Sequence, residues 1–283
     1  MGNDAANSNI AHTQSVGASP HFLGTTARIY FIARNTFREA VRDRVLYNLV
    51  LFVLLLTGAA IFVGELSGGQ ERKIIVDLGL SSMLVFGVFI AIFVGVGLVY
   101  KEIERRTIYA IFAKPVGRGE FLIGKYFGLC LTLLVNVLVM GAGVSAALLY
   151  VNRGFDPLMA RIWPAILLVY VELAILTSIA LLFSSFSSPA LSALLTFFIF
   201  IIGHFSSDLK SLSTSMSSSA ARWLFSAVYY LLPNLANYGF ITPAAHGHLP
   251  DWFYVLNVIV YGLIYIVMIL AAATLIFRRR NFK

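Results

Sequence analysis

The chain has 283 residues, of which 59% are hydrophobic and only 12% are charged. Soluble domains carry about 25% charged residues, so the composition excludes a globular protein with a fully water-facing surface. The net charge of +8 would suggest nucleic acid in a soluble protein, but here the basic residues lie at the ends of apolar runs. Several runs approach the roughly 20 residues of a membrane-spanning helix. The sequence predicts an all-α polytopic membrane protein that binds membrane lipid and no nucleic acid.

The N-terminal part divides into a polar tail and a basic helix. Residues 1–24 lack both the basic and the apolar stretch of a signal peptide, so they are predicted to form a disordered cytoplasmic tail. Residues 25–44 alternate arginines with an apolar face, which is typical of a helix lying in the membrane interface. An ordinary solvated helix is the alternative, and the adjoining apolar run argues against it.

Six membrane spans are predicted within a transmembrane domain of residues 25–283. They cover approximately residues 45–64, 79–100, 126–150, 164–183, 190–206 and 254–277. The two termini and the loop 101–125 then share one side, which holds 15 of the 21 Lys and Arg residues. The positive-inside rule places that side in the cytoplasm.

Residues 223–240 are too short for a seventh span. Pro233 and Asn234 interrupt the segment, and a seventh span would move Arg278–Arg280 to the outside. We therefore expect residues 207–252 to form external or re-entrant helices before the last span.

The loop 101–125 is the longest charged stretch between apolar segments. Ile108, Ile111 and Phe112 fall at i, i+3 and i+4, which predicts a short amphipathic helix that ends at Pro115. Such a loop is either a solvated connector or a docking surface. Its last part, GEFLIGKY, contains G-x-x-x-x-G-K but continues with Tyr126 and follows no strand, so it is not a P-loop.

Few residues suggest chemistry inside the membrane. Glu172 lies near the middle of a predicted span, where a carboxylate is costly and normally faces a protein interior or cavity. It is interpreted either as a polar contact in a translocation path or subunit interface, or as a protonated side chain bonded to a neighbouring helix. His204, His246 and His248 lack metal-ligand spacing, and no nucleophile–base pair is recognisable. No catalytic, cofactor or metal site is predicted.

The charged loop resembles that of the ABC-2 type permeases. Glu104-Arg105-Arg106-Thr107, then Lys114-Pro115-Val116-Gly117-Arg118, Glu120 and Gly124-Lys125 match the family's pattern after its second span. Arg106 departs from that pattern, since the family has Gly there. The chain is most similar to the branch of nitrous-oxide-reductase maturation and gliding-motility permeases.

The resemblance implies a permease subunit in a bacterial-type inner membrane. Such a subunit binds no ATP itself and works as an exporter. ATP and Mg²⁺ would bind a separate cytoplasmic ATPase, and a second permease subunit would complete a homo- or heterodimer. The loop would contain the coupling helix. The implied coupling residues are Glu104, Arg105, Thr107, Ile108, Ile111, Phe112, Lys114, Pro115, Arg118 and Glu120.

Two other functions compete with this interpretation. An ion-gradient-driven transporter would carry ionisable residues in several spans and two matching halves, whereas only Glu172 qualifies and no repeat is visible. A scaffold that binds an ATPase without moving a substrate has the same sequence features as a permease. The apolar spans favour an amphipathic, lipid-like or peptidic cargo over a simple ion.

Overall fold

The computed structural model describes residues 24–42, 44–104, 117–155, 157–206, 208, 210–211 and 218–279. Secondary structure within these residues is helical throughout, as the sequence predicts. Four segments are long and apolar enough to cross a membrane: Glu71–Leu98, Arg118–Asn152, Pro157–Ser184 and Trp252–Arg278. Together with the apolar composition, they make the chain a multi-pass membrane protein.

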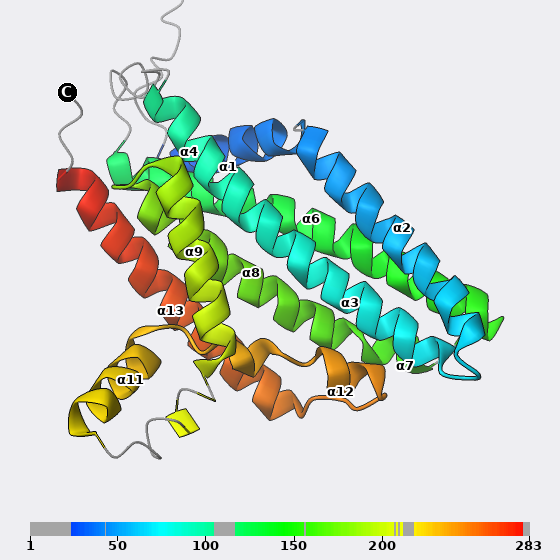
Figure 1. Cartoon of the computed structure of the whole chain (residues 1–283). Coiled ribbons are helices and arrows are strands. Elements are labelled where there is room, and N and C mark those ends of the chain that lie inside the picture. Colours follow the sequence, from blue (N-terminus) through cyan, green and yellow to red (C-terminus); the bar gives the residue numbers. More distant parts are fainter. Residues whose placement is uncertain are drawn as a thin grey trace, which may run out of the picture.

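Figure 1 shows the described helices in chain order. They are α1 (Thr25–Val41), α2 (Arg44–Leu66), α3 (Glu71–Phe89), η2 (Ile90–Val94), α4 (Gly95–Glu104), α6 (Arg118–Asn152), α7 (Pro157–Arg161), α8 (Trp163–Ser184), α9 (Pro189–His204), α11 (Ser219–Leu231), η3 (Leu235–Tyr238), α12 (Ile241–Ala245) and α13 (Trp252–Arg279). The predicted tail lies almost wholly in residues 1–23, outside the described part of the chain.

Helix α8 forms the centre of the bundle. In the apolar 18-residue stretch of the segment that contains α8, 78% of the residues are buried inside the protein. In the corresponding stretch of α13, only 22% are buried. Helices α3, α4, α6, α9 and α13 all pack on α8. A polar side chain on α8 is therefore enclosed by other helices, whereas α13 leaves most of its apolar surface for lipid.

The segments α3, η2 and α4 form one continuous helix that is longer than the predicted span. It begins at Glu71, before the predicted span 79–100, and continues to Glu104, inside the predicted charged loop. Glycines bring it close to its neighbours: a Cβ at Gly79 would lie 2.6 Å from Val144 Cγ2, and one at Gly87 would lie 2.5 Å from Leu173 Cδ1. Small residues allow such close helix packing in lipid.

Helix α1 packs on the first half of α6. A Cβ at Gly124 would lie 2.7 Å from Ile32 Cβ, and one at Gly128 would lie 2.6 Å from the backbone oxygen of Ala33. The GxxxG pair in the sequence thus provides the surface on which the basic helix rests. The contact places α1 against the start of α6.

The segment between α9 and α13 is held by tyrosines of α13. Helix α11 ends before Pro233, and the backbone then continues as the short helix η3. Tyr265 donates a hydrogen bond to Leu231 O, and Tyr254 donates one to Asn237 O at 2.6 Å. Tyr261 Oη accepts the Asn234 N–H at 3.0 Å. These bonds satisfy backbone groups that the broken helix leaves without helical partners.

The two ends of the bundle differ in their elements (Figure 1). Helix α1, the end of α4, the start of α6 and the end of α13 lie at one end. The α2–α3 turn, α7 and α12 lie at the other end. All elements that border residues 105–116 are therefore at the same end as the C-terminal part of α13.

Substituting Gly128 by Ala should loosen α1 from α6. The added Cβ meets the backbone oxygen of Ala33, which cannot rotate away, and overpacking of this kind costs about 1–3 kcal/mol. The free energy of unfolding in mixed micelles measures the effect. Gly97→Ala is the matched control, because a Cβ at Gly97 has no atom within 4 Å. Equal stability of the two variants would contradict the packing described here.

Candidate functional site

The predicted coupling residues lie at the end of the bundle where α4 ends and α6 begins. Seven of them fall outside the described residues: Arg105, Thr107, Ile108, Ile111, Phe112, Lys114 and Pro115. The backbone of Glu104 belongs to α4, and its side chain is not described. Arg118 and Glu120 lie in the first turn of α6, so the structure shows what they contact.

The Glu120 carboxylate joins two elements. Its Oε2 accepts the backbone N–H of Gly117 at 3.0 Å, which caps the start of α6. Its Oε1 lies 3.3 Å from Arg28 Nη2 of α1, and the two side chains are 16% and 29% exposed. An acid in the first turn also interacts favourably with the helix dipole. Glu120 thus fixes the beginning of α6 and ties it to α1.

Lys125 forms a second link between α6 and α1. Its side chain is 1% exposed, and Nζ lies 3.6 Å from Glu39 Oε2 of α1. The same Nζ lies 5.8 Å from the centre of the Phe121 ring, within cation–π range. A buried ammonium needs such partners, because the desolvation of an unpaired charge is expensive.

The opposite side of the same turns contacts the end of α13. Arg118 Nη1 donates to the backbone oxygen of Arg278 at 2.9 Å. The Phe121 and Phe277 rings stack at 6.1 Å, and a Cβ at Gly119 would lie 2.9 Å from Thr274 Cγ2. We call the set Arg28, Glu39, Gly117, Arg118, Glu120, Phe121, Lys125 and Phe277 the α6 anchor.

The α6 anchor changes how Arg118 and Glu120 are understood. The resemblance implies that both residues couple this chain to an ATPase, and both contact other helices of this chain. Arg28, the partner of Glu120, and Glu39, the partner of Lys125, were not singled out from the sequence, where Arg28 is one of several arginines on a polar helix face. Only the tertiary packing of α1 selects them.

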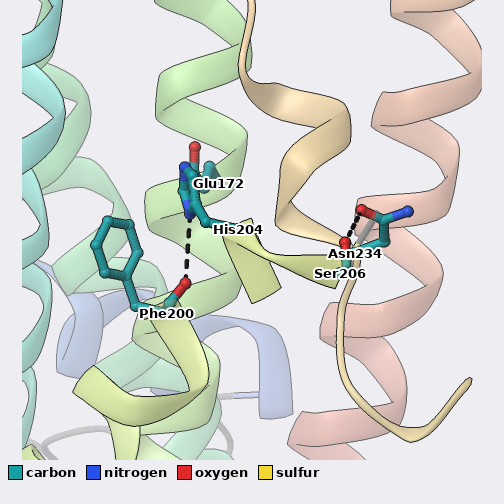
Figure 2. Close-up of polar contacts among 5 residues, drawn as sticks. All are labelled: Glu172, Phe200, His204, Ser206 and Asn234. Carbon is teal, nitrogen blue, oxygen red and sulfur yellow. Dashed lines mark hydrogen bonds and ion pairs between the residues drawn. The ribbon is translucent and has the colours of Figure 1, made fainter. Parts of the chain in front are cut away.

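Glu172 lies in the interior of the bundle, close to His204 at the end of α9 (Figure 2). Its side chain is 1% exposed, and Oε1 lies 3.6 Å from His204 Nε2. Neither carboxyl oxygen has a hydrogen-bond partner among the described residues. The sequence identified Glu172 but not its partner, because the two are 32 positions apart and on different helices.

The His204 ring fixes how a proton can be placed in this pair. Its Nδ1 lies 3.3 Å from the Phe200 backbone oxygen, and a carbonyl only accepts, so Nδ1 carries hydrogen. A neutral ring then presents an unprotonated Nε2 to Glu172. At 3.6 Å the carboxyl oxygen lies just beyond hydrogen-bond distance of Nε2, so the two groups form a close polar contact without a hydrogen bond.

The end of α9 rests on the segment that precedes η3. A Cβ at Gly203 would lie 2.9 Å from Pro233 O and 2.7 Å from Leu235 Cγ. Ser206 donates a hydrogen bond to Asn234, as Figure 2 shows beside His204. The end of α9, which carries His204, therefore packs on a non-helical stretch of backbone rather than on another long helix.

Metal binding receives no support from the described residues. They contain no group of three or more His, Cys, Asp or Glu side chains that could hold an ion. His246 and His248 are exposed, and His246 Nδ1 lies 2.9 Å from Thr242 O.

Comparison with known sequences gives one family and two related proteins. The model of a family described as "ABC-2 family transporter protein" matches residues 30–282. A "Probable ABC transporter permease protein NosY" of Pseudomonas aeruginosa is 29% identical over 126 residues, which is 43% of this chain and 46% of that protein. A protein of the same description from Stutzerimonas stutzeri is 29% identical over 124 residues, 42% of this chain and 44% of that protein. The similarity thus spans less than half of each relative.

A double-mutant cycle tests the Glu172–His204 pair. Glu172→Met and His204→Phe each remove one polar partner, and we expect a coupling free energy of about 0.5–3 kcal/mol between them. Glu172→Gln should cost less than Glu172→Met, because an amide still offers Nε2 a hydrogen. Unfolding free energies in mixed micelles provide the measurement. Strict additivity, or equal effects of Gln and Met, would show that the pair does not interact.

Proposed function

The chain belongs to the ABC-2 family of transporter proteins, and from this premise we propose that it is a permease subunit driven by a separate cytoplasmic ATPase. Membership makes it a membrane subunit of an ABC transporter, with the ATPase on another chain. The observation that carries the finer proposal is the α6 anchor, which ties the segment after residues 105–116 to two other helices.

The proposed topology has six spans with both termini in the cytoplasm. Helices α2, α3 to α4, α6, α8, α9 and α13 form the spans. Helix α9 has 16 residues, and at 1.5 Å per residue it covers roughly 24 Å, short of a roughly 30 Å hydrocarbon core. The segment 231–240 packs against the C-terminal end of α9. As a re-entrant element, it occupies the part of the hydrocarbon core that α9 does not cover. Non-helical backbone is tolerated at such depth where protein surrounds it.

The coupling step begins at residues 105–116. Closure of the ATPase dimer displaces the predicted helix that contains Ile108, Ile111 and Phe112. Helix α4 leads directly into this segment, and α6 begins directly after it. A displacement therefore reaches both long helices at their ends, and rigid helices carry it through the membrane.

The α6 anchor determines what moves with α6. Because Glu120 and Lys125 join α6 to α1, and Arg118 joins it to α13, the start of α6 cannot shift without these two helices. In this role Arg118 and Glu120 transmit the movement, and the apolar face of the loop contacts the ATPase. The unit that responds to ATP consists of α1, α6 and the end of α13.

The substrate is proposed to be amphipathic or lipid-like and to be exported through a dimer of permease subunits. An apolar cavity of about 350 Å³ lies between the α3–η2 helix and α9, lined by residues such as Phe89, Phe93 and Phe197. It borders the π-helical segment η2, and such segments often occur at functional sites. Glu172 supplies a polar group in the interior, on the α8 side of α9.

An ion-gradient-driven transporter is the second candidate. The close approach of two ionisable side chains, Glu172 and His204, inside the bundle is the observation that favours it. Such a mechanism would make transport depend on a proton gradient and not on ATP. Collapse of the gradient in proteoliposomes, with ATP present inside or outside, separates the two functions.

Removing the apolar face of the loop should uncouple the ATPase. We expect Ile111→Ser combined with Phe112→Ser to lower ATP hydrolysis by the assembled complex to the rate of the ATPase alone. The control is Leu249→Ser, an exposed apolar residue between α12 and α13. Unchanged hydrolysis and unchanged assembly in the double variant would overturn the proposed contact.

Exchanging the charges of Arg28 and Glu120 tests transmission through the anchor. Arg28→Glu and Glu120→Arg each place like charges at 3.3 Å, so each should reduce ATP-driven transport while the ATPase stays bound. The combined exchange restores opposite charges and should recover much of the loss. If the combined variant were as defective as the product of the two, the pair would have no role in coupling.

A further inference from the structure

A basic cavity lies at the end of the bundle opposite α1. It has a volume of about 270 Å³ and lies between the α2–α3 turn, α7 and the turn after α12. Its lining includes the basic side chains of Arg72, Lys73 and Arg161 together with His246. Among the described residues that line it, none is acidic. The cavity thus gathers positive charge from α3 and α7, and a histidine from the turn after α12.

The proposed membrane topology does not by itself explain why these basic residues lie together. In the proposed topology only six of the 21 Lys and Arg residues lie on this translocated side, and three of the six line the cavity. Basic residues on the translocated side work against the positive-inside rule. Their convergence on one cavity therefore indicates a specific partner of negative charge.

The geometry of the cavity suits a phosphate group. Arg161 Nη1 donates to Gly247 O at 3.5 Å, which joins α7 to the turn after α12 and leaves other guanidinium hydrogens available. A planar guanidinium binds phosphate oxygens in pairs, and a neighbouring ammonium adds a point charge. Gly69 and Gly247 line the cavity and carry no Cβ, so the backbone there is open to a ligand. Both have positive φ, of 101° and 77°.

We propose that this cavity binds the phosphate of an anionic phospholipid headgroup at the membrane surface. The adjoining helices α3, α6 and α8 are candidate spans, and the cavity lies where they end, at the level of lipid headgroups. The lipid's acyl chains would extend along the apolar exterior of the bundle. A free phosphate or a phosphorylated solute has the same oxyanion chemistry, and the experiment separates these sources from a lipid.

The test measures lipid retention by the purified full chain. Phosphatidylglycerol is titrated in micelles of a neutral detergent, and bound lipid is counted by native mass spectrometry. We expect Lys73→Ala combined with Arg161→Ala to weaken binding by about tenfold or more, since a charge-assisted hydrogen bond is worth at least that factor. Lys210→Ala combined with Arg222→Ala is the control, because it removes the same charge from exposed positions on the same side.

The outcomes distinguish a lipid from a soluble anion. Loss of phosphatidylglycerol in the cavity variant alone, with no competition from millimolar inorganic phosphate, supports the lipid site. Loss together with competition by inorganic phosphate supports an oxyanion site for a soluble ligand and overturns the lipid assignment. Equal binding by the cavity and control variants overturns the site altogether. Circular dichroism melting of both variants, together with the milder Lys73→Gln, verifies that the comparison is between folded proteins.

Discussion

The contact between the start of α6 and the basic helix α1 determines how the charges at this end of the protein can act. Two glycines remove the side chains that would separate the helices, and a Cβ at Gly128 would lie 2.6 Å from the α1 backbone. That close approach brings Glu120 to Arg28 and Lys125 to Glu39. The partly exposed Arg28–Glu120 pair contributes little stability, so its importance lies in setting the register of the two helices, whereas the buried Lys125 needs Glu39 as a partner. Together with the bond from Arg118 to the end of α13, these pairs hold three helices in one arrangement, next to the segment proposed to meet the ATPase.

The interior of the bundle poses a different problem, because a carboxyl group there has no water. Glu172 is enclosed by the most buried helix and faces His204 at the end of a short one. The broken segment around Pro233 closes this region, and tyrosines of α13 satisfy its backbone. The short helix α9 thus ends at His204 of the polar pair, and the irregular backbone around Pro233 packs against that end.

Sequence patterns predict the elements of this fold well and their contacts poorly. Apolar runs and arginine spacing identify the membrane class, the basic helix α1 and the interruption at Pro233, because each is local along the chain. The charge on Arg118 and Glu120 is equally visible, yet their partners Arg278 and Arg28 belong to distant helices. His204 shows the same limit, since nothing local relates it to Glu172. The second span was predicted to begin near residue 79, but Glu71 already begins α3, because the helix extends beyond its apolar part.

A cross-link from the loop to the ATPase tests the proposed coupling most directly. A photo-reactive phenylalanine analogue is placed at Phe112 in the assembled complex and irradiated with and without ATP. If the loop meets the ATPase, a covalent adduct with the ATPase forms and its yield changes when ATP binds. The same analogue at Phe253, at the start of α13, should give no such adduct. An adduct from Phe253 but not from Phe112, in a complex that hydrolyses ATP, would contradict the proposed coupling route.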